Sequence, residues 1–447
     1  MIEEQDDVMP NNETPTLTNK ADLVYALSNH SLIICIILSC SDFSYFFGEE
    51  VEQEAVSQNA FLRALSSFTD SQVQVASSPT SKSSDIQSPF SISVSSLCHS
   101  LSNSLSDGIG LRRRPALVLL YLLLHHNSSF KACVLSRSDI DRLAVPLLRI
   151  LYTYTSYKDK DKDKEGDKEK DKDNEKEPVI TPWNRDHAYL ALICLLIFTE
   201  DDSFCRFVND LTLNSKTLTA FYTEHSDASA LGTDPTLASL SLLVFLRAIR
   251  RNLLIGRDHY LHTSCLAALA NQCAHASDMN SAVASRLVDL LVALARRRVR
   301  LCAILRTTAP GVAYEDTEAA LSATDDTARL LLEAIYAALY ARGRGPGTNA
   351  NLVVSLLREQ DAISAAYRNV ANFQDLLQNV QFIMNYFAAH LDQESSSSSP
   401  QLGPPSKISI AQNTVTSVSE VLRVVKTASS HFPLSRLRKV STLHITQ

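Results

Sequence analysis

The sequence predicts an all-α protein, built as an armadillo- or HEAT-like solenoid of antiparallel helix pairs with disordered insertions. Of the 447 residues, 45% are hydrophobic, but only 7% are aromatic and only 11 are glycine. Strand-rich folds need more β-branched and aromatic residues and more turn glycines, so this balance favours helices. Apolar segments of about 12–25 residues alternate with short polar breaks, which is typical of stacked helix hairpins.

The expected helices follow from apolar periodicity and from residues that start or stop helices. Ser138 with Asp141 resembles a capping box. Asp234 and Pro235 suit the N-cap and first-turn positions of a helix that Gly256 ends, and residues 306–323 read as a polar break. Helices are expected at 20–40, 61–68, 97–105, 113–126, 130–135, 138–157, 183–198, after 203, and at 236–254, 258–275, 280–305, 325–340, 351–358, 361–367, 373–391 and 415–428.

Composition also predicts the domain organisation. Most of the chain, residues 20–391, is expected to be one helical-repeat region. Residues 158–177 alternate Lys with Asp or Glu and cannot bury apolar surface, so they predict a solvated loop, with a partner-docking segment as the alternative. The other expected segments are a disordered N-terminus (1–19), disordered insertions (70–92 and 158–179), a Ser/Pro linker (392–411), and a C-terminal helix with a basic tail (412–447).

Charge and cysteine usage exclude several classes of function. The net charge of −7 argues against a nucleic-acid-binding protein that relies on phosphate contacts. The nine cysteines include no CxxC pair, which is typical of reduced, buried thiols in the cytoplasm. No serine elbow, phosphate loop or dinucleotide fingerprint occurs. The sequence therefore predicts a protein that is not an enzyme, with no cofactor and no small-molecule substrate.

Three apolar runs are long enough to be compared with membrane spans. They are Leu32–Leu38, Ala116–Leu124 and Tyr189–Phe198. Each has roughly half of the ~20 residues that a spanning helix needs. Buried core helices are the interpretation we favour, and an integral membrane helical protein is the alternative.

Three polar clusters are candidate sites. His259, His262 and Cys265 form H-x-x-H-x-x-C, but a zinc site needs three or four converging ligands and no second cluster supplies the rest. A helix-end or core hydrogen-bonding role is the interpretation we favour over metal binding. Glu200, Asp201 and Asp202 suit a helix N-terminus better than acid–base catalysis. The arginines at 296, 297, 298 and 300 suit a helix C-terminus, with a partner or anionic-lipid contact as the alternative.

Seven segments carry a resemblance to a known family. The central one is Arg257–Asn271, RDHYLHTSCLAALAN. The others, in chain order, are ALSNHSL from residue 26, ALSSF from 64, LLLHHNS from 122, FTEDDSF from 198, NFQDLLQN from 372 and LSRLR from 434. Together they resemble the dymeclin family over about residues 25–439. The matching positions are expected to be structural, and they are Arg257, Asp258, Tyr260, Leu261, His262, Cys265, Leu266, Asn271, Glu200, Asp201 and Asp202.

The resemblance implies a non-enzymatic scaffold that acts in Golgi organisation and vesicle traffic. It implies a cytoplasmic protein with a peripheral Golgi-associated pool, and partners among the proteins of the trafficking machinery. The family's N-terminal half is expected to be missing from this chain. Ile2 stands where family members can carry a myristoylated glycine, so an acyl anchor is not expected here. The alternative from the residues alone is an unrelated helical-repeat adaptor in transport or signalling.

Overall fold

The computed structural model divides into two compact units, residues 1–133 and 134–447, which are described separately. The boundary lies inside the stretch 20–391 that the sequence suggests is one helical region. Among the described residues, every regular element is helical except two strands of two residues each. The described residues are 31, 33–37, 59–70, 91–106, 113–156, 185–214, 217–218, 231–232, 234–256, 258–340, 343–368, 370, 373–397 and 417–437.

The first unit places α4 and α5 against α6. Its elements are α4 Ala60–Ser67, β1 Thr69–Asp70, β2 Ser91–Ile92, α5 Val94–Ser106, α6 Arg113–His126 and α7 Ser128–Leu135, whose last residues pass the unit boundary. The strands β1 and β2 pair in parallel, so they join the two ends of the segment 70–92 that was expected to be a linker. The residues between them lie outside the described part of the chain.

A buried asparagine joins three elements of this unit. Asn127 lies between α6 and α7 and is fully buried. Its amide nitrogen donates to the backbone oxygens of Leu65 and Phe68 at 2.9 and 3.0 Å, and its oxygen accepts from the Phe130 N–H at 2.8 Å. The side chain therefore caps α7 and holds the end of α4 beside it, because a buried carboxamide needs all of its partners.

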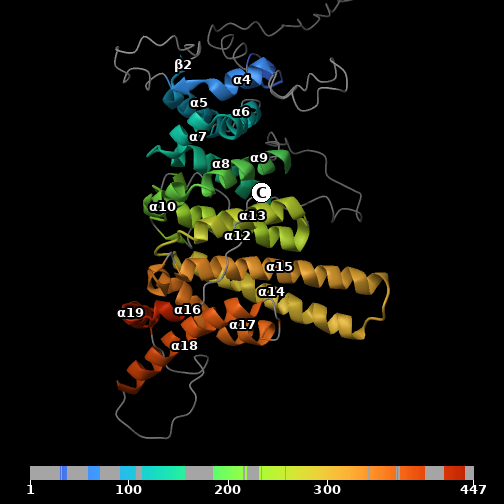
Figure 1. Ribbon diagram of the computed structural model, residues 1–447, viewed down its shortest axis with the longest axis vertical. Helices are drawn as coiled ribbons and strands as arrows, with labels where there is room; N and C mark the ends of the chain where they lie inside the picture. Colours follow the sequence, from blue (N-terminus) through green and yellow to red (C-terminus); the bar gives the residue numbers. More distant parts are fainter. Residues whose placement is uncertain are drawn as a thin grey trace, which may run out of the picture. The chain divides into compact units, whose positions relative to one another are not determined.

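The second unit is a series of packed helices (Figure 1). In chain order they are α8 Asp141–Ser156, α9 Arg185–Thr199, α10 Asp202–Asp210, α12 Leu237–Arg251, the π-helix Asn252–Gly256, α13 His259–Cys273, α14 Ser281–Thr307, α15 Val312–Tyr340, the 3₁₀ helix Pro346–Asn349, α16 Ala350–Arg358, α17 Gln360–Tyr367, α18 Gln374–Ser397, α19 Val418–Ser429 and the 3₁₀ turn Leu434–Arg436.

Consecutive long helices of this unit pack as pairs, and each pair contacts the next. The helices α8 and α9, α12 and α13, and α14 and α15 contact each other within their pairs. Between pairs, α12 contacts α8 and α14, while α13 contacts α9 and α15. Every residue from Leu237 to Leu246 is buried, because α12 is covered on all sides by these neighbours and by α10.

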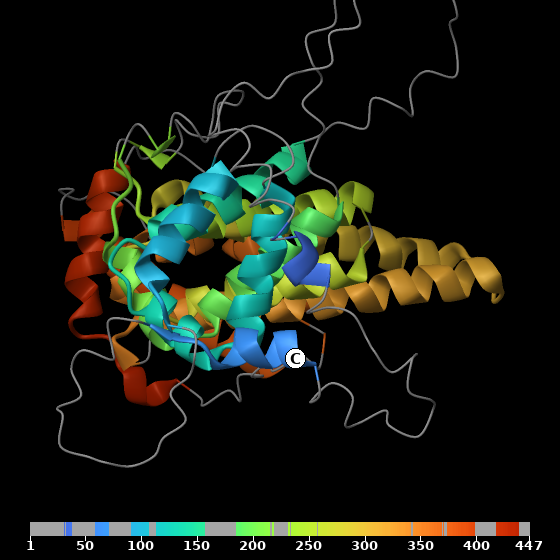
Figure 2. The ribbon, with the colours of Figure 1, turned by 90° about the horizontal axis from the view of Figure 1, so that it is seen from above.

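The helices α14 and α15 form a hairpin that reaches past the ends of α12 and α13 (Figures 1 and 2). Residues 306–323 were expected to be a polar break, and this prediction was wrong: the break is short, and α15 begins at Val312. Its first three turns are rich in alanine and glutamate, which favour helix without any core contact. They bury little, since Val312 is 76% exposed, so the apolar pattern that reveals a core helix is absent here.

Three other predicted boundaries were wrong. The helix predicted to start at Ser138 begins at Asp141, after a turn at residues 138–140. The N-cap of α12 is Thr236 rather than Asp234, because Thr236 pairs with Thr212 in an isolated bridge before its hydroxyl accepts from the Ser239 N–H at 3.2 Å. The helix α18 continues to Ser397, beyond the expected start of the linker at 392.

The three apolar runs have different surroundings. The runs 116–124 and 189–198 are mostly buried in α6 and α9, as predicted. For 32–38 the described residues contradict the prediction, because Ile34 is 55% and Ile37 is 56% exposed. In the described part of the chain, no single helix has the length and composition of a membrane span, although α6 and α7, bent by 105°, meet that criterion as a pair.

Candidate functional site

The start of the segment 257–271, hereafter the signature segment, is joined to two other helices through Asp258. This residue is the N-cap of α13, and its side chain accepts from the Leu261 N–H at 3.1 Å. Asn252, in the π-helix that follows α12, donates to the backbone oxygen of Asp258 at 2.8 Å and accepts from its N–H at 2.9 Å. The other carboxylate oxygen receives the Arg185 guanidinium of α9 at 2.6 Å. The carboxylate of Asp258 therefore connects the starts of α9 and α13, and its backbone holds the π-helix that follows α12.

Aromatic contacts reinforce the connection between α9 and α13. The Arg185 guanidinium lies 5.2 Å from the centre of the Tyr189 ring, and it also donates to the Tyr189 hydroxyl. The Tyr189 ring meets the Tyr260 ring edge-on at 5.4 Å. Cation–π and edge-to-face contacts of this kind each contribute roughly 0.5–1.5 kcal/mol. Tyr260, which is part of the predicted signature, therefore helps to hold α9 against α13.

His262 and Cys265 do not converge with His259. The Nε2 atom of His262 lies 2.8 Å from the Thr327 hydroxyl of α15, so that ring nitrogen already has a partner. Burial lowers the pKa of His262 to about 4, and the nearby His259 and Arg297 act in the same direction. Cys265 is fully buried, and burial raises the pKa of its thiol. Among the described residues, no group of three or more His, Cys, Asp and Glu is placed to hold a metal ion.

The remaining signature positions of this helix fill its core. Leu261 and Leu266 are buried between the helices that flank α13. Arg257 lies outside the described residues, and Asn271 is half-buried near the C-terminal end of α13. The segment thus contributes both the polar contacts of one helix end and the apolar contacts of the layer. Its structural role, which the sequence predicted, is consistent with this placement.

The acidic trio lies where α9 ends and α10 begins. Asp201 is the N-cap of α10, and its carboxylate accepts from the N–H groups of Ser203 and Phe204, both at 2.8 Å. One oxygen of Asp202 lies 2.9 Å from Nε2 of the buried His275, at the end of α13. Helix capping, the interpretation that we favoured from sequence, therefore describes Asp201, while Asp202 connects α10 to α13. Glu200 is exposed.

The four arginines near the middle of α14 divide into two groups. Arg297 donates to the backbone oxygen of Leu253 at 3.3 Å, in the π-helix. Arg298 donates to the Asp325 carboxylate at 2.9 Å and to the backbone oxygen of Ala366 at 3.2 Å. Arg296 and Arg300 are exposed. The interpretation that these arginines complement a helix C-terminus was wrong, because α14 continues to Thr307 and they lie before its last turn.

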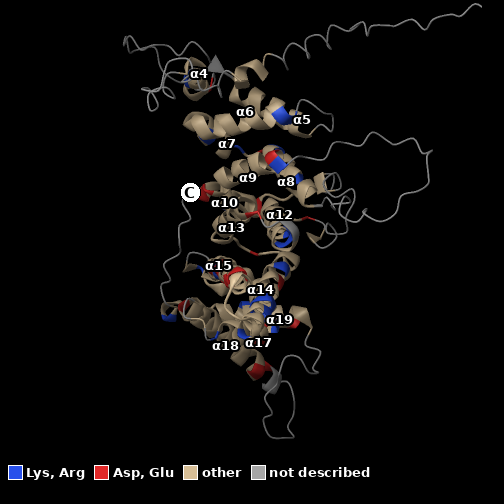
Figure 3. Ribbon diagram, turned by 90° about the vertical axis from the view of Figure 1, so that its right-hand side faces the viewer, with Lys and Arg blue, Asp and Glu red and all other residues tan. Residues whose placement is uncertain are grey.

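Arg296 also lines a basic pocket of about 660 Å³ between α12 and α14. The basic pocket contains five arginines, at 247, 250 and 251 on α12 and at 286 and 296 on α14, with only two carboxylates, Asp289 and Glu359. Basic residues on these two helices are visible in Figure 3. Positions 247, 250 and 251 have the i, i+3, i+4 spacing of one helix face. This spacing is a local signal in the sequence, although it was not among the predicted sites.

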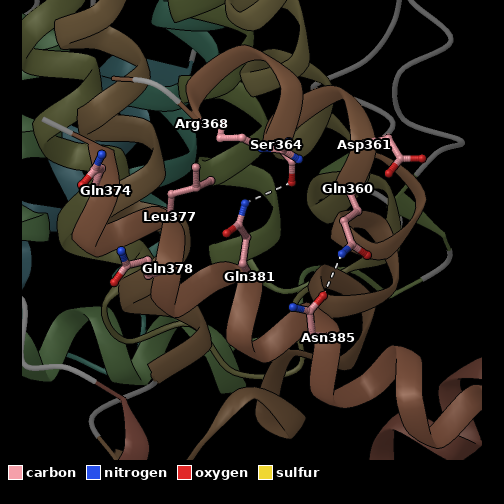
Figure 4. A pocket seen from close by; sticks show the side chains of 9 residues that line it. All are labelled: Gln360, Asp361, Ser364, Arg368, Gln374, Leu377, Gln378, Gln381 and Asn385. Atoms are coloured by element: carbon pink, nitrogen blue, oxygen red, sulfur yellow. Dashed lines mark hydrogen bonds between the residues drawn. The ribbon is translucent and has the colours of Figure 1, made fainter. Parts of the chain in front are cut away.

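A second pocket, of about 440 Å³, lies between α17 and α18 (Figure 4). Its α18 side presents carboxamides at 374, 378, 381 and 385, which is the spacing of one helix face. Gln381 donates to the Ser364 hydroxyl at 3.2 Å, and Gln360 donates to the Asn385 oxygen at 3.0 Å. These bonds connect the two helices across the pocket. Their geometry suits a polar helix–helix contact and includes no nucleophile paired with a base.

Comparison with known proteins identifies the family. A family model described as Dymeclin, Dyggve-Melchior-Clausen syndrome protein, matches residues 5–446. The chain belongs to the dymeclin family. Dymeclin of Xenopus laevis is 29% identical over 423 residues, which are 93% of this chain and 52% of that protein. Dymeclin of Mus musculus is 29% identical over 428 residues, which are 94% of this chain and 52% of that protein.

A more distant match covers less of the chain. Dymeclin of Dictyostelium discoideum is 31% identical over 185 residues, or 41% of this chain and 16% of that protein. The chain spans about half the length of the frog and mouse dymeclins that it matches. No solved structure gives a significant match. The dymeclin relationship therefore rests on sequence similarity. The structure shows where the signature residues of this chain lie and what they contact.

Proposed function

We propose that this dymeclin-family chain is a non-enzymatic scaffold that acts by protein–protein contacts in Golgi organisation and vesicle trafficking. The single observation that carries the proposal is the family match over residues 5–446. The placement of the signature residues supports it, because Asp258, His262 and Asp202 each bond to another helix rather than to one another. Groups used in this way stabilise a helical surface on which partners assemble.

The scaffold is proposed to be an armadillo- or HEAT-like solenoid. In such arrays each helix pair buries its apolar face only against its neighbours. The contacts of α12 with α8 and α14, and of α13 with α9 and α15, support this arrangement within the second unit. An experimentally determined structure tests it. Superposing α8–α9 on α12–α13, and α12–α13 on α14–α15, should require similar right-handed rotations, and unrelated rotations would reject the solenoid.

The proposed localisation is cytoplasmic with a peripheral Golgi-associated pool. Proximity labelling from a tagged chain in cells of its source organism tests the function, with a tag-only protein of equal expression as control. Enrichment of Golgi and trafficking proteins over the control is the expected result. A labelling profile equal to that of the control would reject the proposal.

Membrane extraction tests the mode of attachment. Contacts with protein partners or with exposed basic residues are screened by salt, so high salt or alkaline carbonate should release the Golgi pool. A carbonate-resistant pool would support membrane insertion instead, with the bent pair α6 and α7 as the segment to test. Replacing Leu120, which is buried in α6, and comparing extraction would then decide whether that pair is responsible.

A further inference from the structure

The basic pocket between α12 and α14 concentrates positive charge in a chain whose net charge is −7. Two of its arginines have structural partners on α8. The Arg247 guanidinium lies 4.5 Å from the centre of the Tyr152 ring, and Arg251 donates to the backbone oxygen of Thr155 at 3.2 Å. These contacts hold the two side chains against the wall of the pocket. Their charges nevertheless remain, and they add to the field inside it.

Two other arginines present their guanidinium groups to solvent. Arg250 and Arg296 are exposed, and within the described part of the chain neither makes a hydrogen bond or an ion pair. They come from different helices, α12 and α14, and both line the pocket. A guanidinium group offers a planar set of donors that matches a carboxylate in a bidentate arrangement. The pair can therefore bind carboxylates at two points.

The pocket also has an apolar part at its open edge. Leu254 lines the pocket and is 71% exposed, which is unusual for a large apolar side chain. It lies in the π-helix Asn252–Gly256, and π-helices often occur at functional sites. Buried apolar side chains, among them Leu243, Leu246 and Leu290, also line the pocket. A ligand that covers Leu254 gains from burying that surface.

The signature segment holds this π-helix in place. Asn252 is fixed by its two hydrogen bonds with Asp258, and the backbone oxygen of Leu253 accepts from Arg297 at 3.3 Å. These bonds fix the two residues that immediately precede Leu254. Asp258 of the segment 257–271 and Arg297 of α14 therefore help to fix this edge of the pocket.

We propose that the basic pocket binds an acidic segment of a partner protein, with an apolar side chain of that segment covering Leu254. The inference rests on the scaffold function proposed above and gives it a class of partner. Five arginines against two carboxylates supply the charge complementarity. A membrane surface fits less well, because a planar array of headgroups contacts protruding residues, whereas these groups surround a hollow of about 660 Å³.

Binding of a defined peptide to the purified full chain tests the proposal. The probe is a short fluorescein-labelled peptide in which glutamates surround two leucines at i, i+4 spacing. Its binding is measured by fluorescence anisotropy. A peptide with lysine in place of each glutamate is the charge control. The double variant Arg250→Glu with Arg296→Glu should weaken binding by about tenfold or more, since it reverses two of the charges that line the pocket. Leu254→Ser should weaken it by about fivefold.

The matched control is Arg300→Glu with Arg306→Glu, two exposed arginines of the same helix α14 that do not line the pocket. It makes the same change in net charge, so its affinity should stay within about twofold of the unchanged chain. Thermal melts by circular dichroism show that each variant is folded, and all three change exposed residues. If the control variant loses as much affinity as the pocket variant, the effect comes from net charge alone and the pocket is not the binding site. If the pocket variant binds the peptide as well as the unchanged chain does, the proposal is also rejected.

Vesicles of phosphatidylcholine with phosphatidylserine provide the second arm. If the vesicles bind through Arg250 and Arg296 while the acidic peptide does not, the pocket recognises a membrane and the proposal is wrong. If the peptide does not bind, the pocket proposal is rejected, and the Golgi function is still tested by proximity labelling. If the peptide binds but no Golgi proteins are labelled, the cellular function is rejected and the peptide-binding pocket is supported.

Discussion

His262 makes the stability of this protein depend on pH in a predictable way. In the folded chain its Nε2 atom lies 2.8 Å from the Thr327 hydroxyl, in the contact between α13 and α15. Burial is the main reason that the pKa of His262 falls to about 4, and the nearby His259 and Arg297 contribute in the same direction. In the unfolded chain, an imidazole takes its ordinary pKa of about 6.5.

The sign and the size follow from these two values. Between about pH 6.5 and pH 4 the unfolded chain binds the proton more readily, so the free energy of unfolding falls as the pH is lowered. The slope approaches about 1.4 kcal/mol per pH unit, so lowering the pH from about 7.5 to about 5 removes about 2 kcal/mol. Above about pH 6.5 both states are neutral at this position and the contribution is fully present.

Urea denaturation of the unchanged chain and of His262→Gln measures this term. Glutamine offers a polar group toward Thr327 but does not titrate. Between about pH 7.5 and pH 5 the free energy of unfolding of His262→Gln should therefore fall by about 2 kcal/mol less than that of the unchanged chain. His431→Gln, at an exposed histidine, is the matched control and should follow the unchanged chain. Equal pH dependence of the unchanged chain and of His262→Gln would refute the reasoning.

Three further predictions concern buried contacts and a helix cap, and urea denaturation checks each of them. Leu266→Asp should lower the free energy of unfolding by about 4 kcal/mol or more and abolish cooperative unfolding, because Leu266 is buried in α13 and the new charge has no partner. Leu266→Met should lower it by less than about 1.5 kcal/mol. Similar losses in the two variants would contradict this reasoning. Asn349→Ala should cost about 3 kcal/mol, because the buried carboxamide donates to two backbone oxygens and accepts from one N–H, while the exposed Asn385→Ala should change little. Asp201→Ala should cost about 1 kcal/mol by removing the N-cap of α10, and Asp201→Ser should recover most of it; no difference between the two would argue against capping.

The positions of the core helices could be predicted from sequence, because their signals are local. The apolar run at 113–126 matches α6, and α13 and α14 each begin within one residue of the expected start. Apolar periodicity acts within a few residues, so it is visible in the sequence before the tertiary contacts are known. The family resemblance was confirmed for the same reason, since it depends on sequence alone.

The first part of α15, from Val312 to residue 323, could not be predicted in this way. It has helix-forming residues but no buried face, so a search for apolar periodicity reads it as a break. The ion-pair partners of charged residues could not be predicted from the sequence either. Arg298 and Asp325 are far apart in the chain, and only packing of the two helices brings them to 2.9 Å.

The sequence by itself determined the helical class, the family and the approximate ranges of the core helices. Only the tertiary structure decided that Asn252 holds Asp258, that His262 meets Thr327, and that arginines of α12 and α14 share one pocket. The physical reason is the distance along the chain over which the interactions act. Helix formation depends on neighbours three or four residues apart, whereas a pocket depends on which helix faces meet, and that is set by the packing of many side chains together.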